Sequence, residues 1–193
     1  MVMVKKELVY IDQYNLLGIN YYWDKHEAYN ITKDDLLMVG LTSDRVQVHK
    51  DIINSLVDID NIFQQRGYRS YIKDGYRPKD LYELIYKKRV DKYGQGITDQ
   101  LLNMIDMPHS TGKTIDISLW DPVENKEVYM RDKEDGTDAL FVDFYKNKTD
   151  EKSLYYQGLQ EWVTNVMQDQ GFRLGIKREY FHFDYKPDEP KSY

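Results

Sequence analysis

Three amphipathic segments that each end at a glycine constrain the fold of this chain more than any other feature. Apolar residues from Val48 to Phe63 follow the spacing of one buried helical face, with Thr42 or Ser43 as the expected N-cap and Gly67 as the stop. Proline is favoured in the first turn of a helix and glycine just after its end. The predicted helices span 48–63, 78–94 and 154–171, and a shorter one spans 98–105.

The segments between these helices have the alternation or the aromatic content of strands. Residues 68–73 and 114–119 alternate, and 179–185 is rich in aromatic residues. Two polar stretches, 12–35 and 121–149, are predicted to be irregular loops. Long irregular connections favour the α+β class over a regular βαβ array. We therefore predict a small, central, mainly antiparallel sheet with helices packed on it.

Length and composition indicate one globular domain. The chain has 193 residues, close to the ordinary size of a single domain, so we assign 1–193 to one domain. Hydrophobic residues make up 41% and aromatic residues 14%, which is enough for a folded core. There is no cysteine, and this excludes disulfides, thiolate-bound metals and thiol catalysis.

The net charge and the hydropathy of the chain exclude some classes of binding partner. The net charge of −6 argues against general nucleic-acid binding, which needs a basic surface. No apolar run is long enough for a membrane span, and residues 1–10 lack the apolar core of a signal peptide. We therefore expect a cytoplasmic protein that binds neither membranes nor nucleic acids.

Two of the four histidines have surroundings that suggest chemistry. His26 and His49 are interpreted as ordinary surface or hydrogen-bonded residues. His109 lies in a loop shortly before Gly112, and Asp116 follows inside an apolar strand. A buried aspartate is unfavourable unless a partner offsets its charge, and a metal ion beside an imidazole is one such partner.

The second histidine with this kind of environment is His182, which lies among aromatic residues three positions after Glu179. On a regular strand these two side chains would point to opposite faces, so a shared site requires Glu179 at a strand end or a bulge. Two imidazoles, one aspartate and one further carboxylate match a catalytic zinc site. An Fe(II) facial triad usually has its carboxylate two residues after the first histidine, whereas here the gap is seven. Structural roles for these residues also remain open.

Arg77 lies between a predicted strand and a predicted helix. Pro78 restrains it to an extended conformation, so its position in the turn is fixed. Two interpretations remain open: a solvent-facing arginine in a capping turn, or a guanidinium that stabilises an oxyanion in the site.

Taken together, three segments resemble the zinc D-alanyl-D-alanine dipeptidases, which include the vancomycin-resistance dipeptidases. The segments are Asp-Gly-Tyr-Arg-Pro (74–78), His-Ser-x-Gly-x-x-x-Asp (109–116) and Glu-x-x-His (179–182), in the order and at roughly the separations of that family. The dense match covers about twenty residues, and a looser similarity spans most of the chain, including Asn20-Tyr21. The wider group contains D,D- and L,D-carboxypeptidases that act on peptidoglycan.

The resemblance implies a function and an assignment of residues. It implies a zinc D,D-peptidase or hedgehog-like fold and hydrolysis of the dipeptide D-Ala-D-Ala. By this resemblance one Zn²⁺ per chain is bound by His109, Asp116 and His182. Glu179 would be the general base and acid, and Arg77 would stabilise the tetrahedral intermediate. The alternatives are a D,D- or L,D-carboxypeptidase on the same scaffold and a catalytically silent zinc- or peptide-binding module.

Details around the motifs bear on the substrate. Ser110 and Pro78 favour the dipeptidase, because the carboxypeptidases more often have Gln and Ser at these places. Met107, Thr114, Tyr180-Phe181 and the segment 130–137 depart from the family pattern but spare the metal and catalytic positions. Zinc-dependent peptide hydrolysis is thus better supported than this one dipeptide. The acidic residues of the second loop suit a substrate ammonium or a solvated surface equally: Asp132, Glu134, Asp135 and Asp138.

Overall fold

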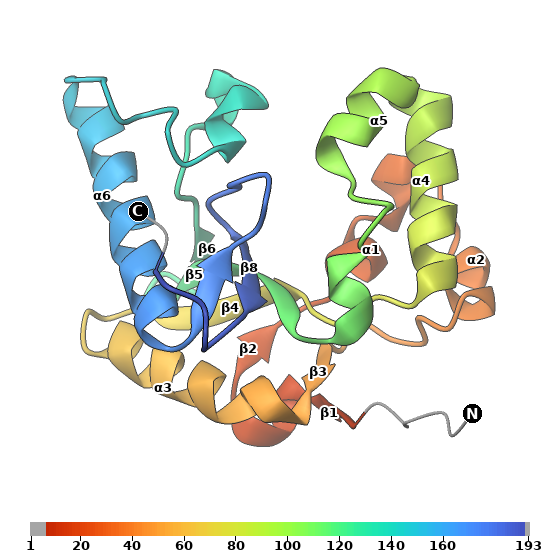
Figure 1. Ribbon diagram of the computed structural model, residues 1–193, viewed down its shortest axis with the longest axis horizontal. Helices are drawn as coiled ribbons and strands as arrows, with labels where there is room; N and C mark the ends of the chain where they lie inside the picture. The colour runs from red at the N-terminus through yellow and green to blue at the C-terminus, as the bar shows by residue number, and fades with distance from the viewer. Residues whose placement is uncertain (1–6, 192–193) are drawn as a thin grey trace. The chain divides into compact units, whose positions relative to one another are not determined.

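A computed structural model describes residues 7–191 of the chain (Figure 1). These residues divide into two compact units, which we call unit 1 (residues 7–51 and 72–115) and unit 2 (residues 52–71 and 116–191). The division falls inside two strands, β4 (Arg69–Asp74) and β5 (Thr114–Asp121). The assignment of 1–193 to one domain stays a prediction.

The described residues form two sheets. The larger has six strands in the order β2-β4-β5-β8-β7, with β6 paired to β5, and the smaller joins β1 to β3. The registers of β1 with β3, β5 with β6 and β7 with β8 are all antiparallel. The other strands are β1 (Leu8–Tyr10), β2 (Leu17–Gly18), β3 (Gln47–His49), β6 (Lys126–Val128), β7 (Phe172–Leu174) and β8 (His182–Tyr185).

Six α-helices and six 3₁₀ turns accompany these strands within residues 7–191, so the mixed α+β class is confirmed. The α-helices are α1 (Tyr21–Asp24), α2 (Lys33–Met38), α3 (Ile53–Gln64), α4 (Lys79–Tyr93), α5 (Gln95–Leu101) and α6 (Glu151–Asp169). The 3₁₀ turns are η1 (Ile11–Tyr14), η2 (His26–Tyr29), η3 (Lys50–Ile52), η4 (Pro108–Thr111), η5 (Lys133–Asp135) and η6 (Asp138–Leu140). None of these helices combines the length and the apolar character that a membrane span needs.

In unit 1, α4 is the best predicted helix. It begins directly after Pro78 and ends before Gly94, whose φ of 80° is available to glycine at little cost. Leu81 and Ile85 are fully buried as predicted, whereas Val90 is half-buried. Figure 1 shows α5 beside α4.

The predicted irregular stretch 12–35 is largely ordered into short helices, so that prediction is wrong. Asn20 caps α1 by accepting hydrogen bonds from the N–H groups of Tyr22 and Trp23. Thr32 and Asp35 form a reciprocal capping box at the start of α2. Short polar side chains made this stretch look like a loop, and here they satisfy the unpaired N–H groups of helix ends.

The first predicted helix begins later than its apolar pattern indicated. Val48 is buried in β3, where it pairs with Val9 of β1, and the helix itself begins at Ile53 after the turn η3. Thr42 and Ser43 are therefore not its N-cap. A buried β-branched residue fits either a helix face or a strand, and pairing with a distant segment decides between them.

Unit 2 is built on α3 and α6, which pack together, and on the strand β7 that α6 also contacts. The rings of Phe63 and Trp162 join the two helices with centroids 5.0 Å apart. The helix α6 begins at Glu151, before the predicted start, and Leu154 is 56% exposed although it was predicted to be buried. Ser153 takes that place in the core.

Two further segments differ from their predictions. The short helix predicted over 98–105 is α5, and it ends at Leu101. The stretch 121–149 contains β6, η5 and η6, and it is held by the buried side chain of Tyr145. The Tyr145 hydroxyl donates to Asp135 at 2.6 Å and accepts from the N–H of Asp132 at 3.0 Å.

Candidate metal centre

His109 is held in unit 1 by its backbone and by its ring. It lies in η4 between Met107 and Gly112, which both have positive φ angles of 44° and 74°. Its N–H donates to the Tyr82 hydroxyl at 2.9 Å, and its carbonyl accepts from the N–H of Arg77 at 3.1 Å. The side chain is therefore fixed in a buried position, with the residue only 2% exposed.

The orientation of the His109 ring shows which of its nitrogens faces a hydrogen-bond acceptor. Nδ1 lies 2.9 Å from the carbonyl oxygen of Gly75, which can only accept a hydrogen bond. Nδ1 therefore carries a proton, and Nε2 is the ring nitrogen that can offer a lone pair to a metal, the arrangement typical of metal-binding histidines.

Gly75 places that carbonyl by a close approach of two backbones. A Cβ atom at this position would lie 2.3 Å from the carbonyl oxygen of Gln47, so no larger residue fits. The next residue, Tyr76, donates its N–H to the same Gln47 oxygen at 2.6 Å. Glycine is thus required at this place in the Asp-Gly-Tyr-Arg-Pro motif because the two backbones approach closely. Its carbonyl determines which nitrogen of His109 carries a proton.

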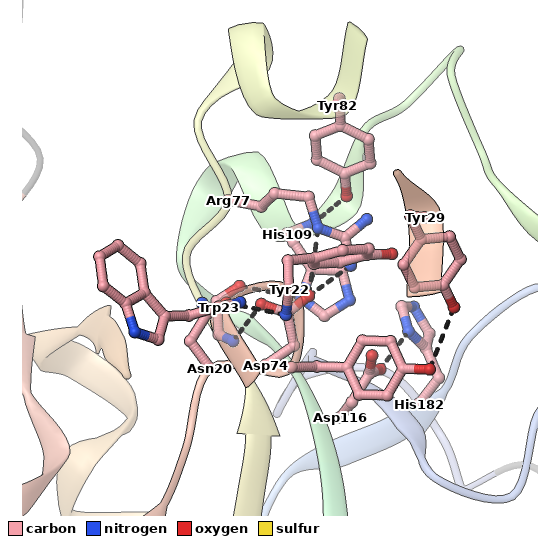
Figure 2. Close-up of polar contacts among 12 residues, drawn as sticks. Asn20, Tyr22, Trp23, Tyr29, Asp74, Arg77, Tyr82, His109, Asp116 and His182 are labelled. Carbon is pink, nitrogen blue, oxygen red and sulfur yellow. Dashed lines mark hydrogen bonds and ion pairs between the residues drawn. The ribbon is translucent and has the colours of Figure 1, made fainter. Parts of the chain in front are cut away.

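Asp116 and His182 form a second anchored pair, in unit 2. The Nδ1 atom of His182 lies 2.8 Å from Oδ1 of Asp116 (Figure 2). Burial by itself would lower the pKa of His182, but the hydrogen bond and the negative charge of Asp116 outweigh it and raise the pKa above its usual value. Both side chains remain partly exposed, at 15% and 19%.

The three predicted ligands form one group that could hold a metal ion. The ligand atoms of His109, Asp116 and His182 lie within 4.8 Å of one another. Two imidazole nitrogens and one carboxylate oxygen suit zinc, and three protein ligands leave a coordination position open. The hydrogen bond from His109 to the Gly75 carbonyl orients the ring, as is usual for a histidine that binds a metal. The residues present therefore fit zinc, and zinc binding itself stays a prediction.

Glu179 lies outside the regular strand, as a site shared with His182 requires. It lies before β8, in an isolated bridge with Phe141, and the turn through Tyr180 and Phe181 separates it from the strand. Its carbonyl accepts from the N–H of His182 at 3.1 Å. The alternation of a regular strand does not apply across this turn. Its role as general base stays a prediction.

Arg77 does not face solvent, so the capping-turn interpretation is wrong on that point. The residue is 4% exposed, and its Nε donates to Oδ2 of Asp74 at 3.1 Å. The guanidinium carbon lies 4.8 Å from the ring centroid of Tyr22 and 4.4 Å from that of Tyr82. Figure 2 shows these groups around Arg77. Burial raises the pKa of both tyrosines, so their hydroxyls stay protonated.

Tyr22 and Tyr82 were not identified from the sequence. Tyr82 lies three residues before the buried Ile85, so its burial could have been read from the helical spacing, whereas its hydrogen bond to the N–H of His109 could not. Asp74 belonged to the recognised motif, but its ion pair with Arg77 became visible only in the structure.

The remaining candidates are engaged elsewhere. Nδ1 of His26 is 2.8 Å from the carbonyl oxygen of Ile31, and Nδ1 of His49 accepts from the N–H of Asp51 at 3.2 Å, as expected of hydrogen-bonded residues. In the acidic loop, Asp132 forms an ion pair with Lys152, and Asp135 accepts from Tyr145. These two carboxylates already have partners within the protein, which does not favour the ammonium interpretation for them.

No protein-family model and no curated protein matches the sequence. Among solved structures, the chain is similar to the LD-carboxypeptidase LdcB, with 19% identity over 74% of this chain and 61% of that one, and a TM-score of 0.48. It is also similar to the vancomycin-resistance D,D-dipeptidase VanXYg, solved with a D-Ala-D-Ala phosphinate analog (19% identity, 92% and 66% coverage, TM-score 0.46). A third is a mutant of the vancomycin-resistance D,D-pentapeptidase VanY, solved with Zn(II) (13% identity, 72% coverage of each chain, TM-score 0.43). The chain spans less than two thirds of the length of LdcB and of VanXYg. Its own activity is therefore inferred from its own residues.

Proposed function

We propose that this chain is a cytoplasmic zinc peptidase of the D,D-peptidase family that hydrolyses D-Ala-D-Ala. The observation that carries the proposal is the group formed by His109, Asp116 and His182. These three residues belong to motifs that resemble the family in order and spacing. A chance cluster of metal-binding side chains would have no reason to draw on these motifs.

The metal would be held by Nε2 of His109 together with the side chains of Asp116 and His182. The hydrogen bond from Nδ1 of His109 to Gly75 leaves Nε2 as the ring nitrogen with a lone pair. When bound, zinc supplies a Lewis acid that polarises a carbonyl group and increases the acidity of water.

Glu179 would move the protons. A carboxylate takes a proton from the attacking water and then delivers it to the leaving amine, as in general base and general acid catalysis. Glu179 lies on a turn that is closed by the bond from the His182 N–H to its own carbonyl, so its backbone is fixed beside a proposed ligand. The carboxylate thus extends from a fixed backbone position, and it is not assigned as a metal ligand.

Arg77 would stabilise the negative charge that develops on the carbonyl oxygen. Its guanidinium is permanently charged, and Asp74 and two aromatic rings restrict its motion. A charge that is oriented before the reaction stabilises a transition state without reorganisation. The loss of one such partner typically lowers the rate about 10²–10³-fold.

The alternative function is a D,D- or L,D-carboxypeptidase that acts on wall peptides. Ser110 and Pro78 favour the dipeptidase by resemblance. A dipeptidase needs the free amine of its substrate, so we expect N-acetyl-D-Ala-D-Ala and longer wall peptides to be hydrolysed much more slowly. A comparable kcat/KM on the free and the acetylated dipeptide would replace the dipeptidase by the carboxypeptidase.

The test combines metal content with turnover. We expect the purified chain to contain about one zinc ion, to release D-alanine from D-Ala-D-Ala and to lose this activity with a chelator. The variant Glu179→Gln should keep the zinc and lose turnover by several orders of magnitude. Glu161→Gln, on the exposed face of α6, is the matched control and should behave as wild type.

Three results would contradict the proposal. Near wild-type hydrolysis by Glu179→Gln would remove Glu179 as the base. Full zinc content in His109→Ala or His182→Ala would remove the proposed metal centre. Zinc binding without hydrolysis of any peptide in a panel of D,D- and L,D-peptides would favour the silent binding module.

A further inference from the structure

Arg89, on α4 of unit 1, carries a charge that its surroundings do not neutralise. Its Nη2 donates to the Tyr29 hydroxyl at 3.2 Å, and its guanidinium carbon lies 5.0 Å from the centroid of that ring. Its Nε is buried and has no hydrogen-bond partner within residues 7–191. No ion pair with a carboxylate is found for Arg89 in this part of the chain.

Among the other enclosed arginines, Arg69 and Arg77 have a carboxylate partner, and the buried Arg173 donates to backbone carbonyls instead. Nε of Arg69 is 2.9 Å from Asp60, and Arg77 binds Asp74. A charged group removed from water without a partner is destabilising, and so is a buried N–H without an acceptor. Arg89 therefore lacks the partner that the fold supplies to Arg69 and Arg77.

The neighbours of Arg89 supply more hydrogen-bond donors. The hydroxyls of Tyr21 and Tyr29 are 3.0 Å apart. Burial, together with its neighbour Tyr29, raises the pKa of Tyr21 well above the usual value of a tyrosine, so this hydroxyl stays protonated. A guanidinium beside two hydroxyls is an arrangement that recognises a carboxylate, because the planar fork matches the two oxygens.

A series of contacts within unit 1 connects this cluster to the proposed ligand His109. The rings of Tyr29 and Tyr22 have centroids 5.9 Å apart, and Figure 2 shows them side by side. The Tyr22 ring lies 4.8 Å from the guanidinium carbon of Arg77, whose N–H donates to the carbonyl of His109. The cluster therefore belongs to the surroundings of a proposed catalytic residue.

We propose that Arg89, with the hydroxyls of Tyr21 and Tyr29, forms a subsite that binds the C-terminal carboxylate of the peptide substrate. This inference rests on the proposed function for the identity of the ligand. The carboxylate supplies the missing negative charge and accepts hydrogen bonds from the guanidinium and from the one hydroxyl that does not donate to the other. The subsite selects substrates that end in a free carboxylate over the corresponding amides.

The experiment measures binding rather than turnover. The full chain, as purified and carrying Glu179→Gln to suppress hydrolysis, is titrated calorimetrically with D-Ala-D-Ala and with its C-terminal amide. We expect Arg89→Met in this background to weaken binding of the acid at least tenfold and to leave binding of the amide unchanged. Lys87→Met removes one positive charge from an exposed position of the same helix and should change neither.

The same data can overturn the inference. Equal weakening for the acid and the amide, no weakening, or no binding of the acid to the parent protein would each overturn it. Arg89→Lys keeps the charge without the fork, so it replaces Arg89→Met if the latter unfolds, and its expected loss is smaller but specific to the acid. A protein that binds the acid through Arg89 yet hydrolyses no peptide refutes the proposed function alone. Hydrolysis together with unchanged binding in Arg89→Met refutes the subsite alone.

Discussion

The imidazole of His182 is confined from two sides by single residues. Oδ1 of Asp116 holds Nδ1 at 2.8 Å, and the backbone of Gly175 lies against the opposite edge of the ring. A Cβ atom on Gly175 would be 2.3 Å from Cδ2 and 3.0 Å from Nε2 of His182. Gly175 also donates its N–H to the His182 carbonyl at 3.0 Å. Glycine at this position therefore sets where the proposed ligand lies.

The variant Gly175→Ala should weaken zinc binding about 10–100-fold, the range typical when a group that orients a ligand is changed. The added methyl group forces the ring of His182 away from its position. Zinc affinity is measured by competition with a chelating indicator, and circular dichroism checks the fold. Gly158→Ala, in α6 with nothing within 4 Å of its new Cβ, should keep the wild-type affinity. Wild-type affinity in Gly175→Ala would show that the ring is not held in this way.

At the scale of elements, the start of α6 depends on a charged cap. The side chain of Asp150 accepts from the N–H of Ser153 at 2.9 Å. This bond, together with the favourable position of a negative charge at a helix N-terminus, holds the pKa of Asp150 below its usual value. Because the folded pKa is below the unfolded one, the ionised cap stabilises the protein above the unfolded pKa of about 3.9. That contribution disappears as the pH falls through the folded pKa.

Asp150→Ala should therefore lower the melting temperature at pH 7, because it removes both the acceptor and the charge. Asp150→Asn keeps an acceptor but cannot titrate, so its difference from wild type should shrink as the pH falls from 5 toward 2. Melting curves of the three proteins across this range make the comparison. A difference between Asp150→Asn and wild type that is independent of pH would refute the assignment of a charged cap.

At the scale of the whole molecule, the proposed metal joins positions that are distant in the sequence. Asp116 and His182 are 66 residues apart, and His109 precedes Asp116 by seven. An ion that binds the folded chain and not the unfolded one raises the free energy of unfolding by mass action. With free zinc at 100 times its dissociation constant, this amounts to about 2.7 kcal/mol.

Removal of zinc with a chelator should thus lower the melting temperature, and added zinc should restore it. His182→Ala should melt at the lower temperature from the start and should not respond to the chelator. His26→Ala, whose histidine lies outside the proposed centre, should keep the full response. Scanning calorimetry at fixed protein concentration measures all three proteins. An identical melting temperature with and without the chelator in the wild type would contradict a metal bound at these ligands.

Several features of this protein follow from short stretches of its sequence. Pro78 and Gly94 mark the two ends of helix α4. Proline restricts the local backbone angles and glycine permits unusual ones, whatever surrounds them. The proposed ligands came from the resemblance of three short motifs to the dipeptidase family, whereas the residue types alone supplied only the inventory of a zinc site. The α+β class followed because some segments alternate as strands do and others repeat with the period of a helix.

Only the tertiary structure decided which distant groups meet. Val48 fits a helix by its spacing, but it lies in a strand because β1 is available to pair with it. Arg77 is enclosed by Asp74 and by the rings of Tyr22 and Tyr82. Arg89 is left without a carboxylate partner in the described part of the chain. The sequence around the two arginines does not reveal this difference. The spacing of apolar residues along the sequence determines whether a segment prefers a helix or a strand, and which of its side chains share one face. Burial and pairing depend on closure of long loops, and the residues that meet there are set by the packing of the folded chain as a whole.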